Sequence, residues 1–475
     1  MANIIGRKLE IKELQAIKSS NKAEFVAIYG RRRIGKTFLI SQTFEKQFCF
    51  SMIGIIDGTR DEQMFAFRDA MNLYNHEIET LPQNWLEAFQ ILRHYLQERM
   101  VKDRKNIIFI DELPCFDTDR SDFVKALGYF WNSWASLQDN LALIVCGSST
   151  SWMIKNIIDN HGGLHNRITK EIHLKEFTLR ETKEYLDANN FVWGDILVLQ
   201  TYMVFGGVPY YLSLLKNDKS LAQNIDHLIF RKNGELRREY HRLYSTLFKN
   251  PKPYLRVVEL LASTKSGISR KDIGDRLKIQ ANGKLTEILA NLESCDIVRF
   301  FKTKQKKISQ QNGLYQLMDF YTLFYLTFAK NDPSNENFWS QQQGRPATNT
   351  WLGLAFEKVC IAHISQIKSA LHIDTIQTEH YSWRINKAED SESAQIDMVI
   401  ERADSMINIC EMKYSEGPYK VSKSEYDKFN DRAQKFTSHT CWKGGIIPTL
   451  VTANGVQENE YSQRFVARVE LGDLL

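Results

Sequence analysis

The sequence contains no pair of closely spaced cysteines and no long hydrophobic run. Its seven cysteines lie scattered over 475 residues without a C-x-x-C pair, which argues against a disulfide framework or structural zinc and fits a reducing interior. The first eight residues lack the apolar core of a signal peptide. The aromatic stretch from Tyr315 to Ala329 carries Gln316 and Asp319 and is shorter than the ~20 residues of a spanning helix. We therefore expect a buried helix there and a cytoplasmic protein with no membrane association.

A strong excess of one charge is also missing. The 62 Lys and Arg residues against 57 Asp and Glu residues give a net charge of +5, which is too small over this length to indicate a nucleic-acid partner by itself. The hydrophobic share of 43% is that of a globular protein and excludes a disordered or collagen-like chain. A chain of this length is expected to form several domains rather than one core.

The most informative segment is a glycine turn with the spacing G-x-x-x-x-G-K-T. The apolar run Phe25–Tyr29 precedes it and Phe38–Ile40 continues it in a helix-compatible pattern. Backbone N–H groups and a helix N-terminus in this arrangement face the phosphates of a nucleoside triphosphate. Lys36 would reach the β and γ oxygens, and the Thr37 hydroxyl would bind Mg²⁺. A chance loop with two glycines is the alternative. The predicted nucleotide contacts are Gly30, Arg31, Arg32, Arg33, Ile34, Gly35, Lys36 and Thr37.

A second strand supplies the acidic groups that such a loop needs. The run Asn106–Ile110 is continuously apolar and ends in Asp111 and Glu112, a pattern typical of a parallel strand buried on both faces. Asp111 would hold Mg²⁺ directly or through water, and Glu112 would polarise the attacking water in hydrolysis. Two solvated acids after an ordinary strand are the alternative.

A third buried run, Leu141–Cys146, precedes hydroxyl residues that could sense the γ-phosphate. Ser148 or Ser149 is the candidate, and a simple turn is the alternative. Arg167 follows a glycine-rich loop and could complete a neighbouring nucleotide site as an arginine finger, or form a surface salt bridge. The finger requires that subunits assemble, and no stretch specifies an interface, so a homo-oligomer stays open.

These segments resemble the archaeal-type ATPases, which belong to the additional-strand P-loop class that includes AAA+ and STAND NTPases. The resemblance implies an ATP-hydrolysing domain over roughly the first half of the chain. Phe205–Leu212 is similar to the glycine-proline element that such ATPases carry in a helical lid near the nucleotide, which adds Pro209 to the expected contacts. The residues that carry the resemblance are 30–37, 110–112, 146–149 and the opening 5–10 with Leu14.

The middle of the chain predicts three helices and a basic hairpin. Pro251 and Pro253 mark a boundary after a basic stretch. Helix, helix, helix and hairpin is the order of a winged helix-turn-helix, whose third helix can enter a major groove while the wing contacts phosphates. A winged helix used only for packing is the alternative. The expected helices are 254–264, 268–277 with Ser269 as N-cap, and 282–292, and the hairpin carries four lysines within 302–307.

A second cluster of acidic residues is expected near the C-terminus. The helical pattern of 350–367 puts Glu357 on an apolar face, where a carboxylate is costly unless it is paired or bound to metal. Two later strands, 395–400 and 407–414, are joined by a short polar turn. Such a turn would bring Asp397 beside Glu411, with Lys413 just beyond.

Asp, Glu and Lys in this arrangement suit phosphodiester hydrolysis with magnesium. Asp397 and Glu411 would bind the hard cation through oxygen, and the metal would polarise phosphate and lower the pKa of bound water. Lys413 would orient that water or stabilise developing charge, and Glu357 would complete or support the metal shell.

The pattern Glu357, Asp397, Glu411-x-Lys413 resembles the PD-(D/E)XK nucleases, and more narrowly the nuclease-like C-terminal domain fused to archaeal-type ATPases. Ile396 stands where proline is common. The resemblance implies magnesium-dependent cleavage. A degenerate descendant that binds without cutting is the alternative.

Together these patterns predict an α/β multidomain protein that hydrolyses ATP with Mg²⁺, binds DNA and cleaves phosphodiesters. The alternatives are a STAND-like switch and a transcription regulator that reads an operator through 282–292. The expected parts are a P-loop ATPase core with a parallel sheet (1–180), a helical lid (181–248), a winged helix-turn-helix (249–312), a helical linker (313–344) and a restriction-endonuclease-like α/β domain (345–475).

Overall fold

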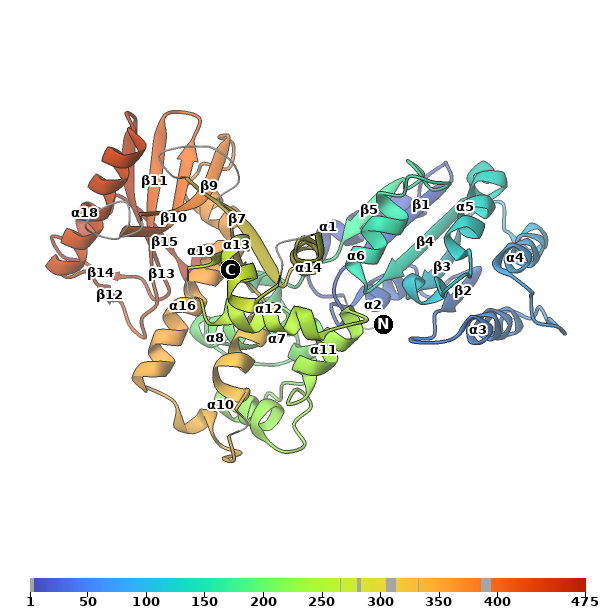
Figure 1. Cartoon of the computed structure of the whole chain (residues 1–475), viewed down its shortest axis with the longest axis horizontal. Coiled ribbons are helices and arrows are strands. Elements are labelled where there is room, and N and C mark those ends of the chain that lie inside the picture. The colour runs from blue at the N-terminus through green and yellow to red at the C-terminus, as the bar shows by residue number, and fades with distance from the viewer. Residues whose placement is uncertain (1–3, 265, 280–282, 305–312, 332, 386–393) are drawn as a thin grey trace. The chain divides into compact units, whose positions relative to one another are not determined.

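The computed structural model describes residues 4–264, 266–279, 283–304, 313–331, 333–385 and 394–475. The chain divides into two compact units (Figure 1). The first unit contains Met1–Glu176 and Thr246–Lys249, and the second contains Phe177–Ser245 and Asn250–Leu475. None of the helices in the described part has the length and apolar character needed to cross a membrane.

The first unit is built on a five-stranded sheet with the order β2-β3-β4-β1-β5, in which every neighbouring pair is parallel. This confirms the predicted parallel sheet. All residues of β1, β3 and β4 are buried, as expected for strands that are covered on both faces. The strands are β1 (Glu24–Tyr29), β2 (Phe50–Ile53), β3 (Asn106–Asp111), β4 (Leu141–Gly147) and β5 (Lys170–His173).

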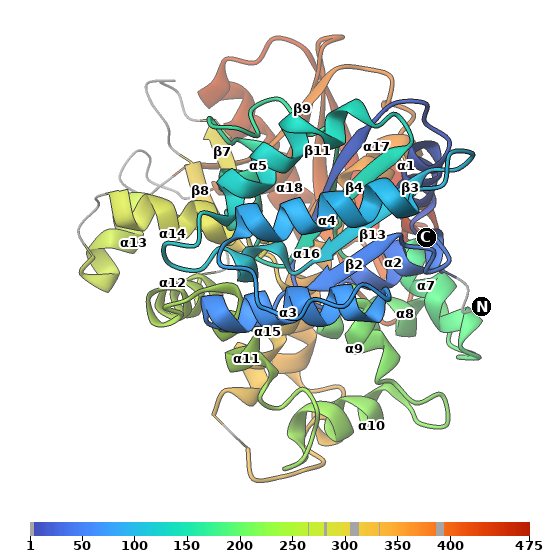
Figure 2. The ribbon, with the colours of Figure 1, turned by 90° about the vertical axis from the view of Figure 1, so that its right-hand side faces the viewer.

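Helices cover both faces of this sheet. Val26 and Ile28 of β1 pack with α1 and α2 on one face, whereas Phe25 and Ala27 pack in the core formed with α3, α4 and α5 on the other. Figure 2 shows α3 and α4 lying over that second face. The helices are α1 (Lys8–Lys18), α2 (Lys36–Thr43), α3 (Arg60–Leu73), α4 (Trp85–Arg99), α5 (Phe123–Ser133) and α6 (Thr150–Met153), with short turns η1 (Leu113–Phe116), η2 (Ala135–Leu137) and η3 (Ile154–Ile158).

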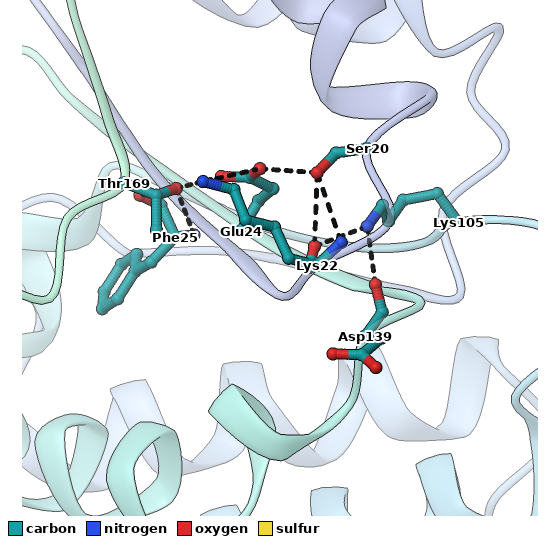
Figure 3. A network of polar contacts seen from close by, with 7 residues as sticks. All are labelled: Ser20, Lys22, Glu24, Phe25, Lys105, Asp139 and Thr169. Atoms are coloured by element: carbon teal, nitrogen blue, oxygen red, sulfur yellow. Dashed lines mark hydrogen bonds and ion pairs between the residues drawn. The ribbon is translucent and has the colours of Figure 1, made fainter.

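A polar network ties the segments that enter the amino ends of four strands (Figure 3). The Glu24 carboxylate accepts a hydrogen bond from the Thr169 hydroxyl, which links the starts of β1 and β5. Lys105 Nζ donates to the carbonyl of Lys22 at 2.7 Å and to that of Asp139 at 2.8 Å. This edge of the sheet is therefore closed by structural contacts, and the opposite, carboxyl edge is the one where parallel sheets bind ligands.

The second unit begins with a series of short helices. Its aromatic helix α15 begins at Phe320, because Asp319 caps it by accepting a hydrogen bond from the Thr322 N–H at 2.6 Å. The prediction of one helix from Tyr315 to Ala329 is therefore wrong in its first part, which is strand. The elements are α7 (Leu179–Ala188), α8 (Asp195–Phe205), α9 (Pro209–Ser213), α10 (Leu221–Ile225), η4 (Asp226–Phe230), α11 (Glu239–Leu247), α15 (Phe320–Phe324), η5 (Tyr325–Ala329) and η6 (Trp339–Gln341).

Three helices and a hairpin lie between these segments, in the predicted order. Ser269 caps α13 by accepting a hydrogen bond from the Asp272 N–H at 3.1 Å. The tip of the hairpin, with Lys306 and Lys307, lies outside the described residues. The elements are α12 (Lys252–Ala262), β6 (Ile268–Ser269), α13 (Arg270–Leu277), α14 (Gly283–Ser294), β7 (Val298–Lys304) and β8 (Gly313–Leu317).

The hairpin continues directly into the C-terminal sheet. Strand β7 pairs with β8 on one side and runs parallel to β9 on the other, with Thr303 opposite Ser382. The eight strands take the order β15-β13-β11-β10-β9-β7-β8-β6. The expected helix 350–367 is two helices. The elements are α16 (Pro346–Ala362), α17 (Ile364–Ala370), β9 (Thr378–Ile385), β10 (Ala394–Arg402), β11 (Met406–Lys413), β12 (Tyr419–Lys420), α18 (Lys423–Thr440), β13 (Gly445–Thr452), β14 (Val456–Gln457), η7 (Ser462–Arg464), β15 (Ala467–Glu470) and α19 (Leu471–Leu474).

Gly207 allows a close approach between two segments of the second unit. Its carbonyl accepts a hydrogen bond from the Phe177 N–H at 2.7 Å, and a Cβ at position 207 would lie 1.9 Å from the Phe177 carbonyl oxygen. Only a residue without a side chain fits there unless the backbone moves.

We predict that Gly207→Ala lowers the free energy of unfolding by about 1–3 kcal/mol or more, because the added methyl group overpacks a backbone contact. Urea denaturation followed by circular dichroism measures this. Gly353→Ala is the matched control, because position 353 lies inside α16 and a Cβ added there would have no atom within 4 Å, and alanine is the better helix former. Equal stability of the two variants would contradict the prediction.

Candidate functional site

The glycine turn predicted from the sequence forms a loop between β1 and α2. Gly30 has φ 143°, and a Cβ there would lie 2.2 Å from the carbonyl oxygen of Leu174. Gly35 has φ 86° and is the N-cap of α2. Both conformations are open to glycine at little cost, so the two glycines of the motif are required by the backbone.

Lys36 lies buried inside this loop. Its Nζ donates hydrogen bonds to the carbonyl oxygens of Gly30, at 2.8 Å, and Arg31, at 2.9 Å. The ammonium group is therefore held at the centre of the turn, where the N-terminus of α2 begins. A positive charge at a helix N-terminus is favourable for an anion, so the local electrostatics suit a phosphate group.

Asp111 lies at the carboxyl end of β3 and meets the first turn of α2. The Thr37 hydroxyl donates to Asp111 Oδ2 at 2.6 Å. Asp111 Oδ1 accepts from the Glu112 N–H at 2.8 Å and from Cys146 Sγ at 2.6 Å. Burial raises the pKa of the Cys146 thiol well above its usual value, and the Asp111 charge raises it further, so the thiol stays protonated and donates. The structure thus brings together the two predicted magnesium ligands, Thr37 and Asp111.

Glu112 follows in a left-handed conformation, with φ 46°. Its Oε2 accepts a hydrogen bond from the Ser148 hydroxyl at 2.7 Å and from the Ser148 N–H at 3.3 Å. The predicted water-polarising acid and the candidate sensor are therefore neighbours at the carboxyl edge of the sheet, as strands β3 and β4 are adjacent.

The three arginines of the loop differ in exposure. Arg31 is buried and forms an ion pair with Glu176, whereas Arg32 and Arg33 are partly exposed. Ile34 belongs to the core beneath α2. Their predicted contacts with a nucleotide stay predictions.

The two remaining candidates do not lie in the loop itself. Arg167 is exposed in the segment before β5, and Pro209 is the first residue of α9 in the second unit. Their roles as a finger and as a lid contact also stay predictions.

Three residues that contact the site escaped the sequence reasoning. Arg7 donates from Nη2 to the Ile34 carbonyl at 3.3 Å, Glu176 pairs with Arg31, and Cys146 contacts Asp111. Arg7 and Cys146 lie in segments that carry the family resemblance, but no local pattern indicates these contacts, because each joins segments that are far apart in the chain.

A second acidic site lies within the second unit. Strands β10 and β11 pair antiparallel, with Met398 opposite Cys410, so Asp397 and Glu411 are the next residues across the pair. Glu411 Oε1 is 2.9 Å from Lys413 Nζ, and its Oε2 is 2.6 Å from Arg432 Nη2 of α18. The predicted juxtaposition of Asp397, Glu411 and Lys413 is therefore present, and Arg432 is an additional cation that the motif did not indicate.

Glu357 and Asp397 line one cavity of about 270 Å³. Burial raises the pKa of both carboxyl groups. The Asp397 charge adds to the rise at Glu357, while the Gln395 amide, which donates to Asp397 Oδ1 at 2.5 Å, opposes the rise at Asp397. Two acids that share a buried space favour a cation or a proton between them.

Two basic residues line the same cavity. Burial lowers the pKa of Arg299 to about 10, although the nearby Asp397 charge opposes this fall, so the guanidinium stays charged at neutral pH. Burial also lowers the pKa of Lys358 to about 7, and its Nζ donates to the Leu317 carbonyl at 2.8 Å. The cavity therefore combines acidic and basic walls.

The acidic residues at this cavity supply some, but not all, of the ligands that a magnesium ion needs. Within the described residues, no group of three or more His, Cys, Asp and Glu side chains is arranged to hold a metal. Mg²⁺, however, is usually held by one or two carboxylates and several waters, and Glu357 and Asp397 supply two that line one cavity. Glu411 is tied to Lys413 and Arg432, so it would join only by exchanging these partners.

Comparison with known proteins supports the assignment of the first site. Residues 4–215 match the family of ATPase domains found predominantly in archaea. An uncharacterized protein of Methanocaldococcus jannaschii is 25% identical over 357 residues, which covers 75% of this chain and 76% of that protein. An uncharacterized ATP-binding protein of the same organism is 42% identical over 43 residues, 9% of this chain and 73% of that protein.

Solved structures are also similar. A Walker-type ATPase of Pyrococcus abyssi matches with a TM-score of 0.45 and 16% identity, over 68% of this chain and 96% of that chain.

The family match spans the glycine loop, the acidic end of β3 and the Ser148 strand end, which are the segments that form the site. Residues 4–215 are therefore similar to the ATPase domains of the archaeal P-loop type.

Proposed function

We propose that this ATPase hydrolyses ATP with Mg²⁺ held by Thr37 and Asp111 and with water polarised by Glu112. The observation that carries this assignment is the 2.6 Å contact between the Thr37 hydroxyl and Asp111 Oδ2, beside the loop that buries Lys36. When bound, Mg²⁺ supplies positive charge that offsets the charge developing on the transferred phosphoryl group.

The chain's own groups perform the other steps. Lys36 exchanges its bonds to the Gly30 and Arg31 carbonyls for bonds to phosphate oxygens, which places the nucleotide. Glu112 orients the attacking water and accepts its proton. Ser148, which donates to Glu112, turns its hydroxyl toward the γ-phosphate and so reports whether that group is present.

Glu112→Gln is expected to lower the rate of ATP turnover about 10²–10⁴-fold, because the amide cannot accept the proton from water, while nucleotide binding persists. Lys36→Ala should weaken binding as well. Steady-state phosphate release and binding of a fluorescent ATP analogue measure the two effects. Glu98→Gln, at an exposed position of α4, is the control for the lost charge. Turnover by Glu112→Gln at the control rate would remove Glu112 from the mechanism.

We further propose that the second unit binds DNA and that the cavity around Glu357 and Asp397 cleaves a phosphodiester with Mg²⁺. The supporting observation is that these two carboxylates line one cavity while Lys413 lies on the neighbouring strand beside Glu411. Asp397 and Glu357 would hold the cation, and Lys413 would orient the water that attacks phosphorus.

A winged helix formed by α12, α13, α14 and the β7–β8 hairpin would deliver the DNA. Its helices α13 and α14 carry exposed basic residues, including Arg276 and Lys284. Because β7 also pairs with β9, DNA bound along this hairpin would lie on the same sheet that carries Asp397. ATP turnover in the first unit would then control access to the second.

A binding-only switch of the STAND type is the second candidate, and one observation favours it. Glu411 is occupied by two cationic partners, Lys413 and Arg432, as expected if the third carboxylate has lost a metal-binding role. Under this proposal the second unit binds DNA or a protein in an ATP-dependent manner without cutting it.

Asp397→Asn and Lys413→Ala are expected to abolish Mg²⁺-dependent nicking of a supercoiled plasmid, with at least a ~100-fold loss, and to leave ATP turnover within about twofold. Asp427→Asn, exposed on α18, should cleave like the wild type. If the wild-type protein binds DNA but never nicks it in Mg²⁺ or Mn²⁺, the switch proposal replaces the nuclease proposal.

A further inference from the structure

We propose that Arg299, which β7 carries outside the expected C-terminal domain, binds the phosphate group of a DNA strand in the Glu357–Asp397 cavity. This inference rests on the proposed function of that cavity. It adds a phosphate-binding residue from the winged-helix segment, so that the cleavage site would be incomplete in an isolated C-terminal domain.

The guanidinium of Arg299 is held rigidly. Its Nε and Nη2 both donate to Gln316 Oε1, at 2.9 and 2.7 Å, and its Cζ lies over the Phe301 ring, 4.3 Å from the ring centroid. Strands β7 and β8 pair antiparallel, with Arg299 opposite Gln316, so the backbone fixes this arrangement. A side chain that is already ordered loses little entropy when it binds a ligand.

This rigid group still has donors available. Within the described part of the chain, Nη1 of Arg299 makes no hydrogen bond, and no ion pair joins the guanidinium to Glu357 or Asp397, although all three residues line the cavity. The Asp397 charge acts on Arg299 across this space. Arg299 and the two acids, Glu357 and Asp397, therefore line one cavity without forming an ion pair. The space between them can hold a ligand that carries both positive and negative charge.

A phosphodiester together with a divalent cation is such a group. When both acids are ionised, a divalent cation neutralises them, and the phosphodiester adds one negative charge that the guanidinium offsets. Arginine suits this role because its planar fork matches the oxygens of phosphate. Lys358 is less suited, since its Nζ donates to the Leu317 carbonyl.

The connection between the two segments keeps Arg299 in place. Strand β7 pairs with β9 through Thr303 opposite Ser382, and the Ser382 hydroxyl donates to the Asp397 carbonyl at 2.6 Å. Arg299 and Asp397 are thus joined by one continuous sheet, and the register of that sheet sets the distance between the phosphate-binding cation and the metal-binding acids.

The test compares Arg299→Gln with the wild-type full-length chain. Binding of a fluorescein-labelled single-stranded oligodeoxynucleotide is measured by anisotropy in Ca²⁺, which takes oxygen ligands, and in EDTA. We expect Arg299→Gln to weaken binding about 10- to 100-fold in Ca²⁺, because a charge-assisted bond is lost, and to change binding in EDTA less than about twofold. Single-turnover nicking in Mg²⁺ should fall at least about 100-fold.

Two further variants keep the test decisive. Arg276→Gln removes an exposed arginine of α13 and should lower binding equally in Ca²⁺ and EDTA. Arg299→Lys keeps the charge but lacks the planar pair of N–H donors, so its DNA binding in Ca²⁺ and its nicking rate should lie between those of the wild type and Arg299→Gln. This variant is used in place of Arg299→Gln if Arg299→Gln does not fold.

The outcomes separate this inference from the function on which it rests. Faster nicking by Arg299→Gln would identify Arg299 as an inhibitory counter-ion, and unchanged binding in Ca²⁺ would also overturn its phosphate role. If the wild-type protein shows Ca²⁺-dependent binding that Arg299→Gln loses, yet never nicks, the phosphate site stands and the cleavage proposal falls.

Discussion

Carboxylates that are packed close together must be neutralised, and both candidate sites are built around this constraint. At the ATPase site, the two oxygens of Asp111 are satisfied by the Thr37 hydroxyl, the Glu112 N–H and the Cys146 thiol. In the second unit, Glu411 is held by Lys413 and Arg432. At the ATPase site, a metal bound between Thr37 and Asp111 would replace the hydrogen bond that now joins them. In the second unit, a metal between Glu357 and Asp397 would enter the cavity that both residues line, and only Glu411 would have to exchange its ion pairs to join it.

The pairing of the strands in each sheet determines which acidic residues lie close together. In the first unit, parallel pairing of β1, β4 and β3 brings the glycine loop and the acidic strand end to one edge, while the network around Lys105 closes the other. In the second unit, the antiparallel pairing of β10 and β11 sets Asp397 beside Glu411. The added β7 then extends this sheet to a segment that the sequence assigns to a different domain. Residues that the sequence analysis places in two separate domains, the winged helix and the C-terminal domain, therefore belong to one continuous sheet.

Features of the fold and of the sites that depend on short-range patterns could be predicted from the sequence. The glycine loop, the buried strands and the Ser269 cap follow from local spacing, and the Asp397–Glu411 pair follows from two strands and a short turn. The aromatic stretch misled the prediction, because apolar content alone does not separate strand β8 from helix α15; the Asp319 cap decides the boundary. The contacts of Arg7, Arg299 and Arg432 were missed, since they depend on pairing between segments far apart in the chain.

The most direct test of two separate metal-dependent sites is anomalous diffraction from crystals grown with Mn²⁺ and a nonhydrolysable ATP analogue. We expect one manganese peak between Thr37 and Asp111, next to the β- and γ-phosphates, and a second between Glu357 and Asp397. A manganese peak at the nucleotide with none in the second cavity, at saturating metal, would contradict the nuclease half of the account. Absence of both peaks with nucleotide bound elsewhere would contradict the whole account.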